Sequence, residues 1–419
     1  MSPYAAWMLA QEARSLLTRL ARVLPFALIE PMVPAAALLP RAQLGIERQL
    51  VAGRRELRAM IRGFLRWLRS PDGRRASPAH AQRRFTFLRM KFNAALIQFD
   101  MFNDVITQRS EHRNGVWLAG LDVASADALS LRGGYYTPPP VVCYLDRGPG
   151  AAIRRARTRL PGGGDNPVAI IRVPRERMVG ASIASSLFHE VGHQGAALLD
   201  LVNSLRPVLQ SLQSGATGPA PVWKLWERWI SEIVADFWSL GRVGVAATHG
   251  LIGVVSLPRI FVFRINIDDP HPVPWIRVLL SCAMGERLYP HPQWQRMARL
   301  WESYYPLEGV PAADKQLLLA LRESMPALAG LLASHRPALL RGTSLPQALQ
   351  VDRRQPAYLA LLFRLWQRKP QRMYDASPVL VFAVIGQARA DGILSPEHES
   401  ILLVRLLTHW ALRNTLTDI

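Results

Sequence analysis

The stretch SIASSLFHEVGHQGAALLDL, residues 182–201, is an apolar segment that carries two histidines, with a glutamate directly after the first. Its apolar residues recur at helical spacing, and His189 and His193 are four residues apart, so an α-helix places both imidazoles on one face. Two imidazole nitrogens in this arrangement are suited to bind Zn²⁺, and Glu190 is suited to accept a proton from a metal-bound water. The alternative is a core helix whose histidines are hydrogen-bonded without a metal.

A second predicted helix, residues 226–241 (WERWISEIVADFWSLG), carries Glu232 and Asp236 four residues apart on one face. Glu232 is the candidate third metal ligand, and Asp236 is the candidate hydrogen-bond partner of the second ring nitrogen of His189. The alternative is an acidic face exposed to solvent. The sequence argues against that alternative, because large apolar residues surround the two acids: Trp226, Trp229, Ile230, Ile233, Val234, Phe237 and Trp238.

The two motifs HEVGH and EIVAD resemble the signature of the gluzincin zinc metallopeptidases, which is HExxH followed by ExxAD on a second helix. The resemblance implies a zincin-like core and one bound Zn²⁺ ion. It also implies that His189, His193 and Glu232 are the metal ligands. Glu190 is then the catalytic base in the hydrolysis of a peptide bond.

The spacing of the motifs indicates which group of zinc metallopeptidases the chain resembles most. The extended metzincin motif needs Gly at position 196 and His or Asp at position 199, where this chain has Ala196 and Leu199. The gap of 39 residues from His193 to Glu232 is similar to that of the group containing the CAAX prenyl proteases and the HtpX-like heat-shock peptidases. The chain is expected to be closest to soluble relatives of that group.

A third segment, IDDPHPVPWIRV, resembles the His-Pro followed by Arg that trails the third ligand in the same group, through Asp268, His271, Pro272 and Arg277. The resemblance implies that His271 is a catalytic residue that places an N–H beside the oxyanion of the transition state. Arg277 is expected to pair with a carboxylate near the site or to orient this loop. The alternative for both is a proline-rich turn that enters a helix.

Tyr289 and His291, in RLYPHPQW, are competing candidates for the role given to His271. Both side chains carry a group that can donate a hydrogen bond to an oxyanion. The alternative is a surface turn that is set by Pro290 and Pro292.

The composition limits the classes of partner. The chain has 419 residues, 49% of them hydrophobic, which is enough for a large core and two or three domains. The formal net charge is +20, but 47 of the 51 basic residues are arginine, and they are spread over many predicted helices. This scatter argues against nucleic-acid binding. A peptide or protein substrate is expected, and an acidic partner surface remains open.

The cysteine content and the apolar segments indicate the cellular compartment in which the protein is expected. Cys143 and Cys282 are too few for a disulfide framework and fit a reducing compartment or two buried thiols. The first 40 residues interrupt their apolar sequence with charges and prolines, which is not typical of a secretory signal. No uncharged apolar window of about 18 residues occurs elsewhere, so no transmembrane span is expected. We expect a cytoplasmic protein, with export by a signal-independent route as the alternative.

Three regions are expected: a helical N-terminal region (1–110), a zincin-like metallopeptidase domain (111–310) and a helical C-terminal domain (311–419). Two short β-branched runs, VVCYL (141–145) and VAIIRV (168–173), predict strands, and the Gly-rich segment between them predicts a loop. VAIIRV is the candidate edge strand for pairing with a peptide substrate, with a buried interior strand as the alternative.

Two shorter segments also carry predictions. Residues 211–222, SLQSGATGPAPV, predict a linker between the two ligand helices, with a lid over the site as the alternative. Near the C-terminus, Ser395 followed by Pro396 predicts the start of a capped helix after a turn at Gly392.

The sequence as a whole predicts an α+β fold that is predominantly α-helical, with a small sheet and an active-site helix in a zincin-like core. The predicted function is that of a zinc metallopeptidase. Two alternatives are a catalytically silent protein that keeps the fold for binding or assembly, and a delivered effector or toxin peptidase. The presence of Glu190 favours an enzyme, because loss of this carboxylate is the simplest way to lose activity.

Overall fold

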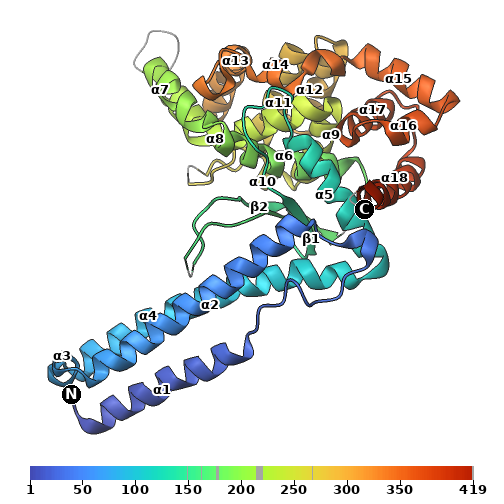
Figure 1. The fold of residues 1–419 in the computed structure, drawn as a ribbon. Coiled ribbons are helices and arrows are strands. Elements are labelled where there is room, and N and C mark those ends of the chain that lie inside the picture. Colours follow the sequence, from blue (N-terminus) through green and yellow to red (C-terminus); the bar gives the residue numbers. More distant parts are fainter. Residues whose placement is uncertain (149, 162, 176–178, 214–219, 267, 418–419) are drawn as a thin grey trace. The chain divides into compact units, whose positions relative to one another are not determined.

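The protein is predominantly helical and contains one small three-stranded sheet (Figure 1), which confirms the predicted class. The structure is a computed structural model that describes residues 1–148, 150–161, 163–175, 179–213, 220–266 and 268–417. The chain divides into two compact units. Unit 1 comprises Met1–Ala119, Pro139–Tyr144 and Arg154–Ile170, and unit 2 comprises Gly120–Pro138, Leu145–Ile153 and Ile171–Ile419.

The elements succeed one another in a simple order. The first part of the chain holds α1 (Pro3–Arg22), η1 (Pro34–Ala36), α2 (Pro40–Arg69), α3 (Pro71–Arg75), α4 (Pro78–Thr107), η2 (Gln108–Ser110), α5 (His112–Leu129), β1 (Val141–Asp146), β2 (Ala152–Arg154) and β3 (Ala169–Pro174). The second part holds α6 (Ala181–Leu198), α7 (Leu201–Gln213), α8 (Ala220–Val243), α9 (Val245–Val255), α10 (Arg259–Val262), α11 (Pro274–Leu288), α12 (Pro292–Tyr304), α13 (Ala312–Ser334), η4 (Ala338–Leu340), α14 (Leu345–Leu349), η5 (Val351–Arg354), α15 (Pro356–Arg368), α16 (Gln371–Asp375), α17 (Pro378–Ala390) and α18 (Pro396–Thr417).

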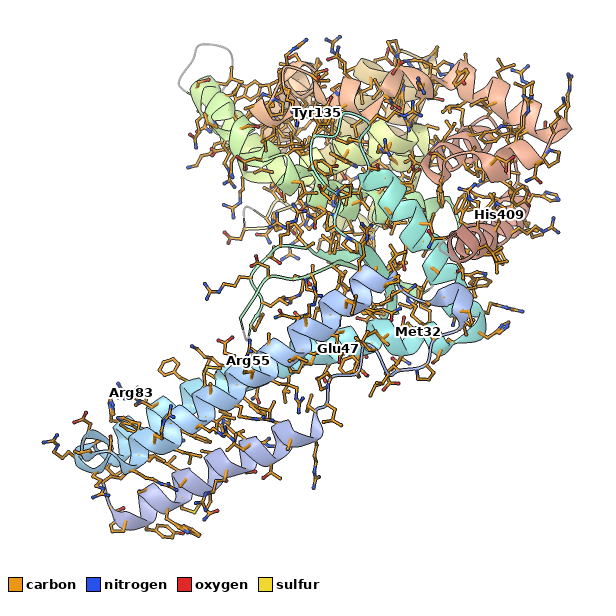
Figure 2. The ribbon with its side chains drawn as sticks, viewed as in Figure 1. Met32, Glu47, Arg55, Arg83, Tyr135 and His409 are labelled. Carbon is orange, nitrogen blue, oxygen red and sulfur yellow. The ribbon has the colours of Figure 1, made fainter. Side chains whose placement is uncertain are left out.

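Unit 1 is built mainly from three helices, α1, α2 and α4, which pack against one another along apolar faces. The N-terminal region is helical, as expected: α2 ends at Arg69, and α4 begins at Pro78, where the Ser77 hydroxyl accepts from the His80 backbone N–H. The carboxylate of Glu47 on α2, which is labelled in Figure 2, accepts from the Ala27 backbone N–H at 2.9 Å. These contacts involve none of the candidate site residues.

The strand order in the sheet is β1-β3-β2. Both predicted strands are confirmed as β1 and β3, but the prediction that VAIIRV is an edge strand is wrong, because β3 lies between two neighbours. Its nearly continuous burial agrees with an apolar run that is covered on both faces. The predicted loop contains the third strand, β2, which is only three residues long and gives little pattern in the sequence.

Helices α6 and α8, which carry the two motifs, pack against each other in the core of unit 2 and also contact α9 and α17. The apolar residues that surround the two acids of α8 are buried, as the sequence indicates. Large aromatic side chains fill this unit; seven fully buried tryptophans are Trp226, Trp229, Trp238, Trp275, Trp294, Trp301 and Trp410. The motif helices are therefore fixed by packing on several sides.

The region after residue 310 shares its unit with the motif helices, which differs from the separate C-terminal domain that was expected. The reason is visible in α13, which packs on α8 and α11 and buries Leu318, Leu321 and Leu328. By length and composition alone, α13 is also apolar enough to cross a membrane. The expectation that the chain has no transmembrane span stays a prediction.

The structure describes the start of the C-terminal helix and both cysteines, but only part of the predicted linker at 211–222. Residues 214–219 of the predicted linker or lid lie outside the described residues, and its remaining residues belong to the end of α7 and the start of α8. The capped helix near the C-terminus is confirmed, since the Ser395 hydroxyl accepts from the His398 backbone N–H and α18 begins at Pro396. Cys143 and Cys282 are both buried.

A glycine inside the first motif allows α6 and α8 to approach closely. A Cβ atom added at Gly192 would lie 2.9 Å from both the Cα and the carbonyl oxygen of Ala235, and 2.9 Å from the Cβ of Trp238. One turn later, a Cβ at Gly195 would lie 2.4 Å from the ring of Trp238. The two helices can meet at this distance only because both positions lack a side chain.

We expect Gly192→Leu to lower the free energy of unfolding by about 1–3 kcal/mol, the usual cost of overpacking, and to weaken metal binding by separating the ligand helices. Chemical denaturation and metal titration would measure the two effects. Gly253→Ala on α9 is the matched control, since a Cβ there meets nothing within 4 Å. It is expected to be neutral or to stabilise the protein by up to about 1 kcal/mol. Equal behaviour of the two variants would contradict the close contact.

Candidate metal centre

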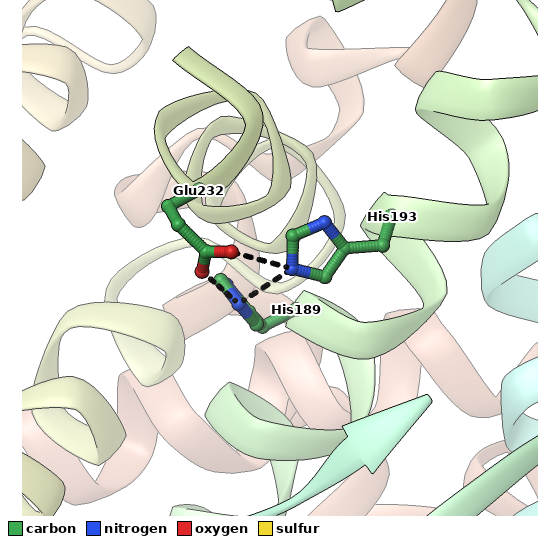
Figure 3. A group of neighbouring side chains, drawn as sticks. All are labelled: His189, His193 and Glu232. Carbon is green, nitrogen blue, oxygen red and sulfur yellow. Dashed lines mark hydrogen bonds and ion pairs between the residues drawn. The ribbon is translucent and has the colours of Figure 1, made fainter. Parts of the chain in front are cut away.

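His189, His193 and Glu232 meet between α6 and α8 (Figure 3). The Nε2 atoms of the two imidazoles are 3.2 Å apart, as expected for residues one helical turn from each other. The Glu232 carboxylate faces both rings, with 3.1 Å from Oε2 to His189 Nε2 and 3.4 Å from Oε1 to His193 Nε2. Each of the three side chains is at least four-fifths buried. This group could hold a metal ion.

The donor atoms are close enough together to surround one ion. With one ligand atom taken from each residue, all three atoms lie within 4.8 Å of one another. The two imidazole nitrogens, 3.2 Å apart, are close to the spacing of about 3.3–3.4 Å between two corners of a tetrahedron around Zn²⁺ with bonds of about 2.0–2.1 Å. A donor set of two imidazole nitrogens and one carboxylate oxygen is also one that zinc accepts. The residues therefore fit the ion that the sequence implies.

Asp236 holds the ring of His189 from the other side. Its Oδ1 atom lies 2.7 Å from His189 Nδ1, so an N–H at Nδ1 donates to the carboxylate, and Nε2 is the ring nitrogen that faces Glu232 and His193. Arg277 in turn donates to both oxygens of Asp236, from Nε at 2.6 Å and from a terminal nitrogen at 2.8 Å. The structure thus places Asp236 and Arg277 directly behind the ligands.

The charges in the site compensate one another. Burial lowers the pKa of His189, but the nearby Asp236 and Glu232 outweigh burial and raise that pKa to about 9. Burial raises the pKa of both carboxyl groups, but the surrounding imidazoles and the Arg277 guanidinium outweigh it and hold both pKa values well below their usual range. Glu232 and Asp236 are therefore ionised at neutral pH, which is the state that a metal ligand and its supporting carboxylate need.

Glu190 follows His189 on α6 and is buried. Burial lowers the pKa of the Arg277 guanidinium, but the surrounding carboxylates, with Glu190 among them, outweigh burial and raise it. The Glu190 carboxylate therefore acts electrostatically on the Arg277 guanidinium. Its place in the motif, between the two candidate ligand histidines, is the one from which the sequence predicts a base for a metal-bound water.

His271 reaches the same centre from the segment before α11. Its Nε2 atom is 3.2 Å from Glu232 Oε2, and its Nδ1 atom is 2.8 Å from Oδ1 of Asp269. The hydrogen bond to Glu232 raises the pKa of His271, although partial burial opposes the shift. About half of its side chain is exposed, so a molecule at the site can reach it.

The competing candidates lie elsewhere. Tyr289 is fully buried, and its hydroxyl donates to the carbonyl oxygens of Leu240 and Gly241 at 3.2 and 3.0 Å. His291 caps the start of α12 by accepting from the Gln293 backbone N–H. Of the three candidates for this role, His271, Tyr289 and His291, only His271 contacts Glu232.

Asp269 was not among the residues predicted from the sequence, whereas the preceding Asp268 was part of the resemblance and lies 3.4 Å from Arg228. Both the backbone N–H and Nδ1 of His271 contact Oδ1 of Asp269, at 2.9 and 2.8 Å. The available signal was the short Asp-Pro-His sequence, which places an aspartate two residues before the histidine and favours such a local turn.

Comparisons of this chain with family models, with curated proteins and with solved structures find no match.

We expect Asp236→Asn to weaken zinc binding by about 10–100-fold, because the ring of His189 loses its charged partner and Arg277 loses its counter-charge. Competition with a chromophoric chelator would measure the dissociation constant. Glu323→Gln, which removes an exposed carboxylate on α13, is the control and should leave the constant unchanged. Identical constants for wild type and Asp236→Asn would exclude a supporting role for Asp236.

Proposed function

We propose that this protein is a zinc-dependent metallopeptidase of the gluzincin type with a zincin-like core around α6 and α8. The observation that supports this most directly is the convergence of two imidazole nitrogens and a carboxylate, from His189, His193 and Glu232, within 4.8 Å of one another. The presence of Glu190 beside these ligands favours hydrolysis over a purely structural metal, because a structural site has no need of a base.

Bound zinc would supply an acidified water and a Lewis acid for the scissile carbonyl. Glu190 accepts a proton from the attacking water and then donates it to the leaving amine, so that one carboxylate serves as base and as acid. Asp236 and Arg277 keep the His189 ring in one orientation and one tautomer during turnover.

His271 is the group that we assign to the oxyanion. Asp269 accepts from Nδ1, and Nε2 faces the Glu232 carboxylate, which raises the pKa of His271 and favours an N–H at this atom. An N–H in this place can donate to the negative oxygen that forms when water adds to the carbonyl. The half-exposed ring is compatible with contact to a substrate.

The test of this function is Glu190→Gln. Because glutamine keeps the size of the side chain and cannot accept the proton, we expect the variant to bind one zinc ion per chain and to lose peptide turnover by at least about 10²-fold. Metal analysis and cleavage profiling of a proteome-derived peptide mixture would measure the two properties. Cleavage at the wild-type rate by zinc-loaded Glu190→Gln would reject Glu190 as the base. A wild-type chain that binds zinc but cleaves no peptide would instead favour the silent binding protein.

His271→Ala tests the oxyanion assignment. We expect kcat to fall by about 10²–10³-fold with zinc content unchanged, because the donor acts on the transition state and is not one of the three ligands. The measurement is steady-state kinetics on a peptide found by cleavage profiling, with zinc content determined in parallel. His291→Ala is the matched control on unit 2 and should keep wild-type kcat. Loss of zinc from His271→Ala would show that this residue is a ligand and would contradict the assignment.

A further inference from the structure

A cavity of about 690 Å³ lies in unit 2 among residues of α7, α8, α13 and the segment that leads to His271. Its walls are mainly apolar and include Leu225, Ile265 and Leu317. The volume falls within the range of about 300–1,000 Å³ that is typical of ligand sites, and an apolar lining with a few polar groups is typical of them as well. Neither the metal ligands nor the residues assigned to catalysis line this cavity.

Cationic side chains gather at the cavity: Arg206 on α7 and Lys224 and Arg228 on α8. All three residues are exposed, so their charged ends are available to a ligand. Arg228 also lies 3.4 Å from Asp268, but that carboxylate is almost fully exposed and such a surface pair is weak.

The one acidic side chain in the described lining, Glu227, is already engaged by neutral donors. Its two carboxylate oxygens accept from the side-chain amides of Gln210 and Gln213, at 2.7 and 2.8 Å. The described lining therefore has three cationic side chains and one carboxylate, and that carboxylate is hydrogen-bonded to two glutamines of α7. A net positive, apolar cavity is complementary to an apolar ligand that carries a negative charge.

Helix α8 is one connection between the cavity and the metal centre, because it carries residues of both. Lys224, Arg228 and Glu232 occur at intervals of four residues, which places them on one helix face with about 6 Å between successive residues. The other connection runs through Asp268, which contacts Arg228 and precedes His271 by three residues. A chain bound at the metal centre could therefore extend into the cavity.

We propose that this cavity is the specificity pocket of the peptidase and binds a peptide segment through apolar side chains and one carboxylate. The carboxylate belongs either to an aspartate or glutamate side chain or to the C-terminus of the peptide. Lys224 and Arg228 are the residues that recognise it. This inference rests on the proposed function, because it takes the ligand to be the substrate of the metal centre.

The test uses the full chain loaded with zinc and carrying Glu190→Gln, so that bound peptides are retained without cleavage. The probe is one synthetic peptide library prepared in two forms, with a free C-terminal carboxylate or with a C-terminal amide, and with acidic residues at varied positions. Retained peptides are identified by mass spectrometry. We expect enrichment of peptides that carry a carboxylate near apolar residues. Enrichment in both forms assigns the charge to a side chain, and enrichment in the free-acid form alone assigns it to the C-terminus.

The decisive comparison adds Lys224→Glu and Arg228→Glu to this protein. We expect the enrichment to fall by about tenfold or more and to shift toward peptides with basic residues, the size expected when a charge-assisted contact is reversed. Arg364→Glu with Lys369→Glu, an equal charge reversal at exposed residues on and directly after α15, is the control and should keep the original enrichment. Zinc content and circular dichroism confirm that each variant is folded.

The outcomes separate this inference from the proposed function. Retention without any preference for carboxylates, or a preference that survives both reversals at Lys224 and Arg228, overturns the specificity pocket whether or not the wild type cleaves peptides. Selective retention that the reversals abolish supports the pocket. If the wild type then cleaves none of the retained peptides, the peptidase activity fails while the recognition of a carboxylate stands.

Discussion

The structure of the site depends on how closely two helices approach each other. Gly192 faces the backbone of Ala235, and the indole of Trp238 covers Gly195, so α6 and α8 lie nearer than helices with larger contact residues. At that distance a glutamate on one helix reaches two imidazoles on the other. Gly192 and Gly195 have no chemical role at the site, but they set the distance between the two helices that carry His189, His193 and Glu232.

Local periodicity in the sequence was enough to predict the two motif helices and two of the strands. Four-residue spacing correctly placed the two histidines on one helix and the two acids on another, and the β-branched runs correctly marked two strands. Periodicity could not predict strand order, because VAIIRV reads the same in the middle of a sheet as at a buried edge. It also could not locate the cavity, whose lining comes from segments that are distant in sequence.

The pairing of Arg277 with Asp236 shows a second limit of prediction from the sequence alone. Nothing local to α11 indicates that an arginine at its first turn points toward a carboxylate on α8, because the contact joins residues 41 positions apart. The Pro at the start of α11 indicated only where the helix begins. The resemblance to a known motif supplied the expectation, and the geometry shows which carboxylate the guanidinium meets.

The buried tryptophans around α6 and α8 have a consequence for how the proposed metal centre takes up zinc. In small zinc domains the metal replaces a missing core, so folding and loading are one event. Here aromatic and aliphatic packing joins the two helices without help from the ligands. In the zinc site that we propose, loss of the ion would therefore leave the scaffold in place, so zinc supply would control the centre without synthesis or degradation of the chain.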